Sequence, residues 1–245
     1  MAEDWVSYFL ERYLPHDEVL YRLPASVSIQ EAWPRIMEER KKQAVILPLS
    51  SWDGHPYWYV PTGTVLSSGD RLAQIARTQD LNGWTQYIHD EGVVDEAYYS
   101  SVIEGAYSTR QRAHELVRSK EPPRDLSERM VLSNYRALHF ALEHLDGPIN
   151  EAVVLEIGRL LTDGTLEEGT APGYRTGPVS VVSGYQEVVY RAPEAQYVAP
   201  MMRQLLEYIA DPEVHPVIKA CVAHIYFVTV HPFCDGNGRT ARALA

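Results

Sequence analysis

Residues 231–242 read His-Pro-Phe-Cys-Asp-Gly-Asn-Gly-Arg-Thr-Ala-Arg, and this stretch decides how the rest of the chain is interpreted. Histidine is a general base near neutral pH. Pro232 interrupts regular hydrogen bonding, so a turn is expected there, and Asp235 offers a hard carboxylate of the kind that binds Mg²⁺. The small residues Gly236-Asn237-Gly238 predict a tight turn whose backbone N–H groups form an anion nest. A base, a carboxylate and an anion-binding turn therefore follow one another directly.

The arginines after this turn have helical spacing. Arg239 and Arg242 are three residues apart, which places them on one face of a helix. If that helix begins directly after Gly238, its free N–H groups and its dipole strengthen the anion site. Two guanidinium groups beside such a site suit a polyphosphate. Phe233 is expected to anchor the turn in the apolar core.

Two other interpretations of the stretch are weaker. One is a structural turn with a surface pair of arginines, and the ordered set of residue types argues against it. The other is a dinucleotide-binding turn, because Gly236-x-Gly238-x-x-Ala241 fits the Rossmann fingerprint. That fingerprint needs a direct step from strand to turn, whereas His-Pro-Phe-Cys-Asp separates the preceding apolar run from the first glycine. We therefore reject the dinucleotide site.

At His231–Arg242 the sequence resembles the Fic family, because it fills every specified position of the Fic signature HPFx(D/E)GNGRxxR. The resemblance implies a mostly helical core whose active loop lies between two central helices. It also implies transfer of AMP from ATP, with Mg²⁺, to a Ser, Thr or Tyr hydroxyl of a target protein. By position, it implies that His231 is the base, Asp235 the Mg²⁺ ligand, Gly236, Asn237 and Gly238 the phosphate cradle, Arg239 a phosphate ligand, Arg242 the γ-phosphate partner, and Phe233 the loop anchor.

A second motif lies upstream of the signature. Ser100-Ser101-Val102-Ile103-Glu104-Gly105 matches the Fic inhibitory pattern (S/T)xxxE(G/N), with Ser100, Glu104 and Gly105 in the specified places. A glutamate on a helix packed over the site can pair with Arg242 and so occupy the arginine that should hold the γ-phosphate. Gly105 is expected to let that helix approach the loop closely. The chain thus resembles the Fic class whose inhibitory helix, here about 94–107, precedes the core.

A β-hairpin is predicted in the otherwise helical second half. Residues 179–182 and 187–190 are β-branched or aromatic runs that flank Ser183-Gly184-Tyr185-Gln186. Fic proteins place such a flap beside the active site, where it holds the target segment by strand addition. The resemblance therefore implies target-binding roles for Val179, Val181, Val189 and Tyr190. Gly173-Tyr174-Arg175 resembles the segment that usually precedes the flap in this family.

The predicted fold class is mainly α, with a Fic-type helical core, a hairpin flap and a small mixed α/β segment at the N-terminus. The expected domains are residues 1–92 and 93–245. Helices are predicted at 3–14, 28–42, 70–89, 94–107, 109–120, 126–145, 150–161 and 194–210, with short strands at 44–49, 57–60 and 64–66. Residues 217–230 are apolar nearly all round and predict a buried central helix. The helix after the signature stops within about one turn of Arg242, so the core is expected to be incomplete at its C-terminal end.

Composition excludes several classes of protein. The 245 residues include 22 basic and 33 acidic side chains, a net charge of −11, which argues against a broad contact with nucleic acid. Cys221 and Cys234 are the only cysteines, so disulfide scaffolds and structural zinc modules are excluded. No signal peptide or membrane span is recognised, and a cytoplasmic protein is expected.

The sequence leaves several functions open. The expected enzyme is an autoinhibited adenylyltransferase that uses ATP and Mg²⁺. A relative that transfers another phosphate-containing group, or in which Glu104 orients water to remove AMP, is a second interpretation. A non-catalytic regulator that responds to nucleotide is a third. Self-modification and homo-oligomer formation also stay open, since no residue pattern tests them.

Overall fold

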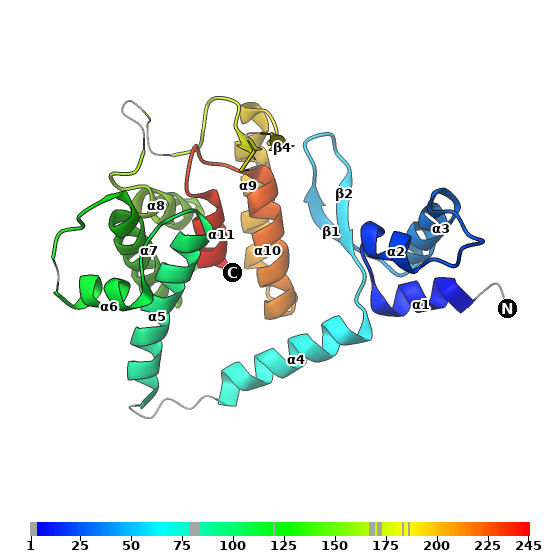
Figure 1. Cartoon of the computed structure of the whole chain (residues 1–245), viewed down its shortest axis with the longest axis horizontal. Coiled ribbons are helices and arrows are strands. Elements are labelled where there is room, and N and C mark those ends of the chain that lie inside the picture. The colour runs from blue at the N-terminus through cyan, green and yellow to red at the C-terminus, as the bar shows by residue number, and fades with distance from the viewer. Residues whose placement is uncertain are drawn as a thin grey trace. The chain divides into compact units, whose positions relative to one another are not determined.

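The computed structural model describes residues 4–78, 84–119, 121–166, 170, 173–182, 184, 185 and 187–245. The chain forms two compact units, one up to Leu72 and one from Ala73 onward. The boundary that the sequence analysis places after residue 92 lies within helix α5 (Figure 1). Among the described residues, no helix is both long enough and apolar enough to cross a bilayer.

Up to residue 62, the described part of the first unit contains three helices and a hairpin. Its elements are α1 (Asp4–Arg12), α2 (His16–Arg22), α3 (Ile29–Lys42), β1 (Val45–Ser50) and β2 (Pro56–Tyr59). Phe9, Val19, Ala32 and Ile36 form a buried core between the helices. Ser28 caps α3 by accepting a hydrogen bond from the N–H of Glu31 at 3.3 Å. These elements agree with the small mixed α/β segment that the sequence predicts.

One predicted strand in this region is wrong. Residues 64–66 belong to the first turn of α4 (Gly63–Thr78), not to a strand. The side chain of Thr62 accepts a hydrogen bond from the N–H of Val65 at 3.2 Å, and its carbonyl accepts one from Leu66 at 3.0 Å. This capping turn outweighs the β propensity of two apolar residues. The helix predicted over 70–89 is represented by the described parts of α4 and α5, and residues 79–83 lie outside the described residues.

The second unit is helical with one hairpin. Its elements are α5 (Trp84–Ile103), α6 (Arg110–Ser119), α7 (Leu126–Glu143), α8 (Glu151–Leu161), β3 (Ser180–Val182), β4 (Val188–Arg191), α9 (Ala195–Ala210), α10 (Pro216–Val230) and α11 (Asn237–Leu244). Short α11 packs against α5, α7 and α8 on one side and α10 on the other (Figure 1). The predicted mainly α class with a hairpin is confirmed.

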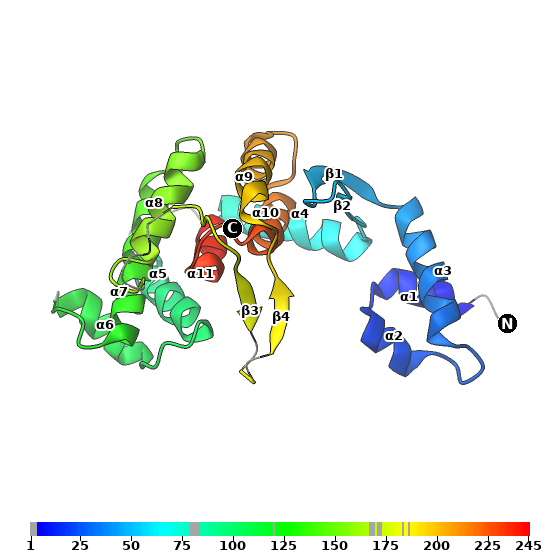
Figure 2. The ribbon, with the colours of Figure 1, turned by 90° about the horizontal axis from the view of Figure 1, so that it is seen from above.

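The hairpin projects from the helical bundle (Figure 2). Its strands are antiparallel, with Ser180 opposite Arg191 and Val181 opposite Tyr190. Ser183 and Gln186 of the predicted turn lie outside the described residues. The hydroxyl of Tyr190 donates to the carbonyl of Thr229 at 2.6 Å, which ties β4 to α10.

Helix α10 is only partly the buried helix that the sequence predicts. Its inner face is buried through Val222, Tyr226 and Phe227, whereas Ile225 is 55% exposed. The predicted helix is therefore confirmed, but among the described residues its burial is partial, on the side that packs against α9 and α11.

The turn between α10 and α11 is anchored by Phe233. Its ring is buried, with its centroid 6.0 Å from that of Phe227 and 5.9 Å from that of Tyr174. The ring lies directly on Gly158 of α8, where an added Cβ would be 2.7 Å from two ring carbons. Glycine is therefore required at position 158 for the Phe233 ring to pack against α8.

We expect Gly158→Ala to lower the free energy of unfolding by about 1–3 kcal/mol, because the new methyl group overlaps the Phe233 ring. Gly92→Ala is the matched control, since Gly92 is also helical but has open space around its Cα. Alanine there should be neutral or stabilise by up to ~1 kcal/mol. Denaturant unfolding of the two variants checks this, and equal effects would contradict the packing argument.

Candidate active site

His231 ends α10 in a left-handed conformation, with φ 51° and ψ 58°. Its Nδ1 lies 3.2 Å from the carbonyl oxygen of Val228. A carbonyl only accepts hydrogen bonds, so Nδ1 carries the proton and Nε2 of the neutral ring carries the lone pair. Burial is the largest cause that lowers the pKa of His231, and the charge of Arg175 lowers the pKa further. The ring is therefore prepared to act as a base through Nε2.

The loop between His231 and α11 is closed by one amide side chain. Asn237 accepts from the N–H of Phe233 through Oδ1 at 2.8 Å and donates from Nδ2 to the Phe233 carbonyl at 2.8 Å. Gly236 precedes α11 with φ 77°, and no side chain caps the helix there. The N-terminal N–H groups of α11 are thus presented by a rigid turn, as an anion site requires.

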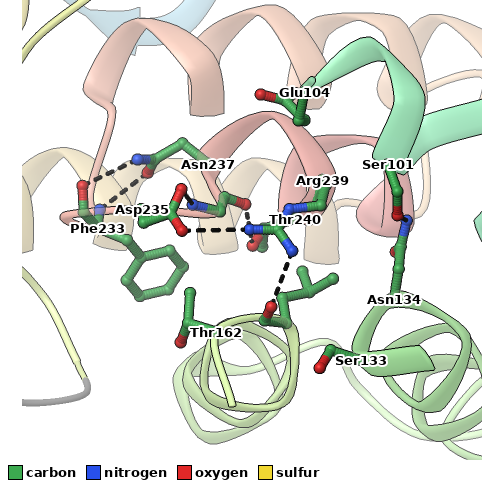
Figure 3. A network of polar contacts seen from close by, with 12 residues as sticks. Ser101, Glu104, Ser133, Asn134, Thr162, Phe233, Asp235, Asn237, Arg239 and Thr240 are labelled. Carbon is green, nitrogen blue, oxygen red and sulfur yellow. Dashed lines mark hydrogen bonds and ion pairs between the residues drawn. The ribbon is translucent and has the colours of Figure 1, made fainter. Parts of the chain in front are cut away.

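Arg239 lies beneath this loop (Figure 3). Its side chain is 1% exposed, and it donates to the carbonyl of Leu161 at 2.9 Å and to the carboxylate of Asp235 at 3.3 Å. Burial lowers the pKa of the Arg239 guanidinium. In this geometry Arg239 joins the loop to the end of α8 and orients Asp235, whose side chain is 53% exposed.

Arg242 is held by the C-terminal end of α5. It donates from Nε to the hydroxyl of Ser100 at 2.8 Å, and from Nη2 to the Ser100 carbonyl at 3.0 Å and to Oε1 of Glu104 at 2.6 Å. The Glu104 carboxylate also lies against Gly238, where an added Cβ would overlap Oε1. Glu104 therefore occupies the space over the first turn of α11 (Figure 3).

Glu104 lies just after the end of a helix, whereas the sequence predicts that it lies within one. Helix α5 ends at Ile103 rather than near residue 107, and Gly105 follows in a left-handed conformation with φ 91°. The N–H groups of Gly105 and Ala106 donate to the carbonyls of Val102 and Ser101, which is the Schellman pattern. The expected reason for Gly105 is wrong, because its Cα faces open space and the close approach occurs at Gly238.

Gly158 and Arg175 both contact the signature segment, although neither has a role predicted from the sequence. Arg175 is buried and donates from Nε to the carbonyl of His231 at 2.7 Å. Its place after Gly173-Tyr174 is the one sequence signal that could have drawn attention to it. Among the residues that the structure describes, no three His, Cys, Asp or Glu side chains gather as a metal site.

Part of the chain matches a known protein family. Residues 148–245 match the model of the Fic/DOC family. The protein adenylyltransferase Fic of Nematostella vectensis is 30% identical over 166 residues, which cover 63% of this chain and 36% of that protein. The matched regions cover 10%, 11% and 36% of three of the curated relatives.

Solved structures agree with the fold. A Fic family protein from Desulfovibrio desulfuricans G20 superposes with a TM-score of 0.63 at 26% identity, over 76% of this chain and 57% of that one. Fic-1 of C. elegans superposes with a TM-score of 0.60 at 20% identity, over 94% of this chain and 63% of that one, which shows the fold alone. With the complete signature on the loop before α11, the family match shows a Fic domain at residues 148–245 of this chain.

Proposed function

We propose that this chain is an autoinhibited protein adenylyltransferase, which transfers AMP from ATP to a hydroxyl group of a target protein. The observation that carries the proposal is the ion pair between Glu104 and Arg242 over the N-terminus of α11. Relatives of this chain bear the name protein adenylyltransferase, which supports the choice of reaction.

The first turn of α11 offers what a triphosphate needs. Its helix dipole and N–H groups favour negative charge, and Gly238 leaves room for a bulky anion. Arg242 adds a guanidinium with a forked set of donors beside that turn. The Glu104 carboxylate already satisfies Arg242 and fills the space beside Gly238, so Glu104 and a terminal phosphate compete for the same place. Arg239 contributes by holding the loop.

Asp235 is the residue that would hold Mg²⁺. Its half-exposed carboxylate accepts from the N–H of Gly236 directly before α11, and Mg²⁺ is commonly bound by one carboxylate together with phosphate oxygens and water. The residues present therefore fit the ion. When bound, Mg²⁺ would neutralise charge on the phosphates.

His231 acts as the base in the proposed reaction. Its Nε2 takes the proton of the target hydroxyl, whose oxygen forms a bond to the α-phosphorus of ATP. The bond from that phosphorus to the bridging oxygen breaks, and pyrophosphate leaves with the electron pair. The product carries AMP on the target oxygen. We propose that the edge of the hairpin near Val179, Val181, Val189 and Tyr190 aligns the target segment by strand addition.

We expect Glu104→Ala to raise the labelling of protein by isotopic ATP at least tenfold, which is about 1.4 kcal/mol, because Arg242 is released for phosphate. Glu96→Ala is the matched control, since Glu96 is an exposed glutamate within α5, the helix that ends just before Glu104. Adding His231→Ala to Glu104→Ala should reduce labelling by about a hundredfold or more.

The mass of the labelled product separates the alternatives. An adduct of AMP supports the proposal, and an adduct of another mass assigns the chain to a different transfer reaction. Equal labelling by wild type, Glu104→Ala and Glu96→Ala would refute autoinhibition. ATP binding without turnover in Glu104→Ala would favour a nucleotide-responsive regulator instead.

The lowered pKa of His231 predicts the pH dependence of kcat/KM in the Glu104→Ala enzyme. A base with a lowered pKa stays neutral to more acidic pH, so the acid limb should lie below the ordinary histidine value of about 6.5. Activity is then retained above this limb and lost as pH falls through it. Because the charge of Glu104 raises the pKa of His231, histidine NMR should give a lower value for Glu104→Ala than for wild type. An acid limb above 6.5 would contradict the assignment of the base.

A further inference from the structure

Arg175 is buried where the hairpin meets the catalytic histidine. The residue is 4% exposed and lies in the loop before β3. Its guanidinium donates from Nε to the carbonyl of His231 at 2.7 Å and from Nη2 to that of Val230 at 3.3 Å. Both carbonyls belong to the C-terminal end of α10, where the helix dipole is negative and a cation is favourable.

The same guanidinium also holds both ends of the hairpin. It donates from Nη1 to the carbonyl of Gly177, before β3, at 2.9 Å, and from Nη2 to that of Pro193, after β4, at 2.6 Å. The backbone N–H of Arg175 donates to the Pro232 carbonyl at 2.8 Å. One buried side chain therefore connects three segments that are distant in the sequence.

This arrangement requires the shape of arginine. Its donors point in several directions in one plane, so they reach carbonyls on both sides at once, whereas lysine offers one compact charge. Loss of the side chain would leave buried carbonyls without their donors, which is costly away from water. Burial lowers the pKa of the Arg175 guanidinium, so its neighbouring carbonyls must compensate for lost hydration.

We propose that Arg175 is a positioning residue, which couples the hairpin to His231 so that the bound target segment and the base keep one fixed geometry. This inference rests on the proposed adenylyltransferase function. Arg175 touches neither the first turn of α11 nor Arg242 in the contacts that define the phosphate site. Its removal should therefore impair transfer to the target while ATP binding is maintained.

The test compares Arg175→Met, Arg175→Lys and the control Arg159→Met, each combined with Glu104→Ala. Arg159 is an exposed arginine of α8 that pairs with Glu156. We expect Arg175→Met to lower kcat for target labelling at least tenfold and to leave the KM for ATP within twofold. Arg175→Lys should recover part of the loss, and Arg159→Met should match its parent. An unchanged kcat, or a loss confined to the KM for ATP, would overturn the proposal.

A second readout does not depend on catalysis. Histidine ¹⁵N NMR, with His231→Ala to assign the signal, reports which ring nitrogen of His231 carries the proton. We expect the Nδ1-protonated form in wild type and Arg175→Lys, and a shift toward the Nε2-protonated form in Arg175→Met. If Glu104→Ala proves inactive but this shift occurs, the proposed function fails and the positioning role stands. An unshifted tautomer in a folded Arg175→Met protein would overturn the positioning role.

Discussion

The guanidinium of Arg242 donates to three oxygen atoms, and all of them belong to Ser100 and Glu104 at the end of α5. These bonds join two motifs that lie far apart in the sequence. Because Glu104 reaches Arg242 across Gly238, the same contact covers the N-terminus of α11. That helix end collects unpaired N–H groups and positive dipole, so it will attract whichever anion is nearest. The rest of the second unit can be understood as support for this one helix end.

Glycines are as important to this support as the charged side chains. Gly158 provides the surface on which the Phe233 ring rests, and Gly238 provides the space that the Glu104 carboxylate fills. Gly236 supplies the left-handed turn from which α11 starts. A residue from a distant segment lies close to the Cα of each of these glycines. A change at any of them would move the loop rather than remove a functional group, which explains why the site depends on residues without chemistry of their own.

Local signals in the sequence predicted most elements correctly, because caps act within a few residues. Ser28 and Asn150 cap their helices as their side chains allow. The start of α4 differs from the predicted strand because the side chain of Thr62 caps the helix there. The exposed face of α10 depends on how the helix packs, and the end of α5 depends on the left-handed turn at Gly105. The hydrophobic periodicity of the sequence indicates neither of them. Arg175 was missed for the same reason, since its partners are backbone carbonyls that carry no sequence signature.

Burial distinguishes the two arginines of the signature, Arg239 and Arg242, and it groups Arg175 with Arg239. The guanidinium groups of Arg239 and Arg175 are almost fully buried and bind backbone carbonyls, which are fixed by the fold, and Arg239 also donates to the neighbouring Asp235 carboxylate. Arg242 is partly exposed, and one of its partners is the side-chain carboxylate of Glu104. A carboxylate at the end of a helix can be displaced by another anion, whereas a buried carbonyl cannot leave its place without unfolding. Of these three arginines, Arg242 is therefore the one whose carboxylate partner comes from a distant segment, and that partner lies over the first turn of α11.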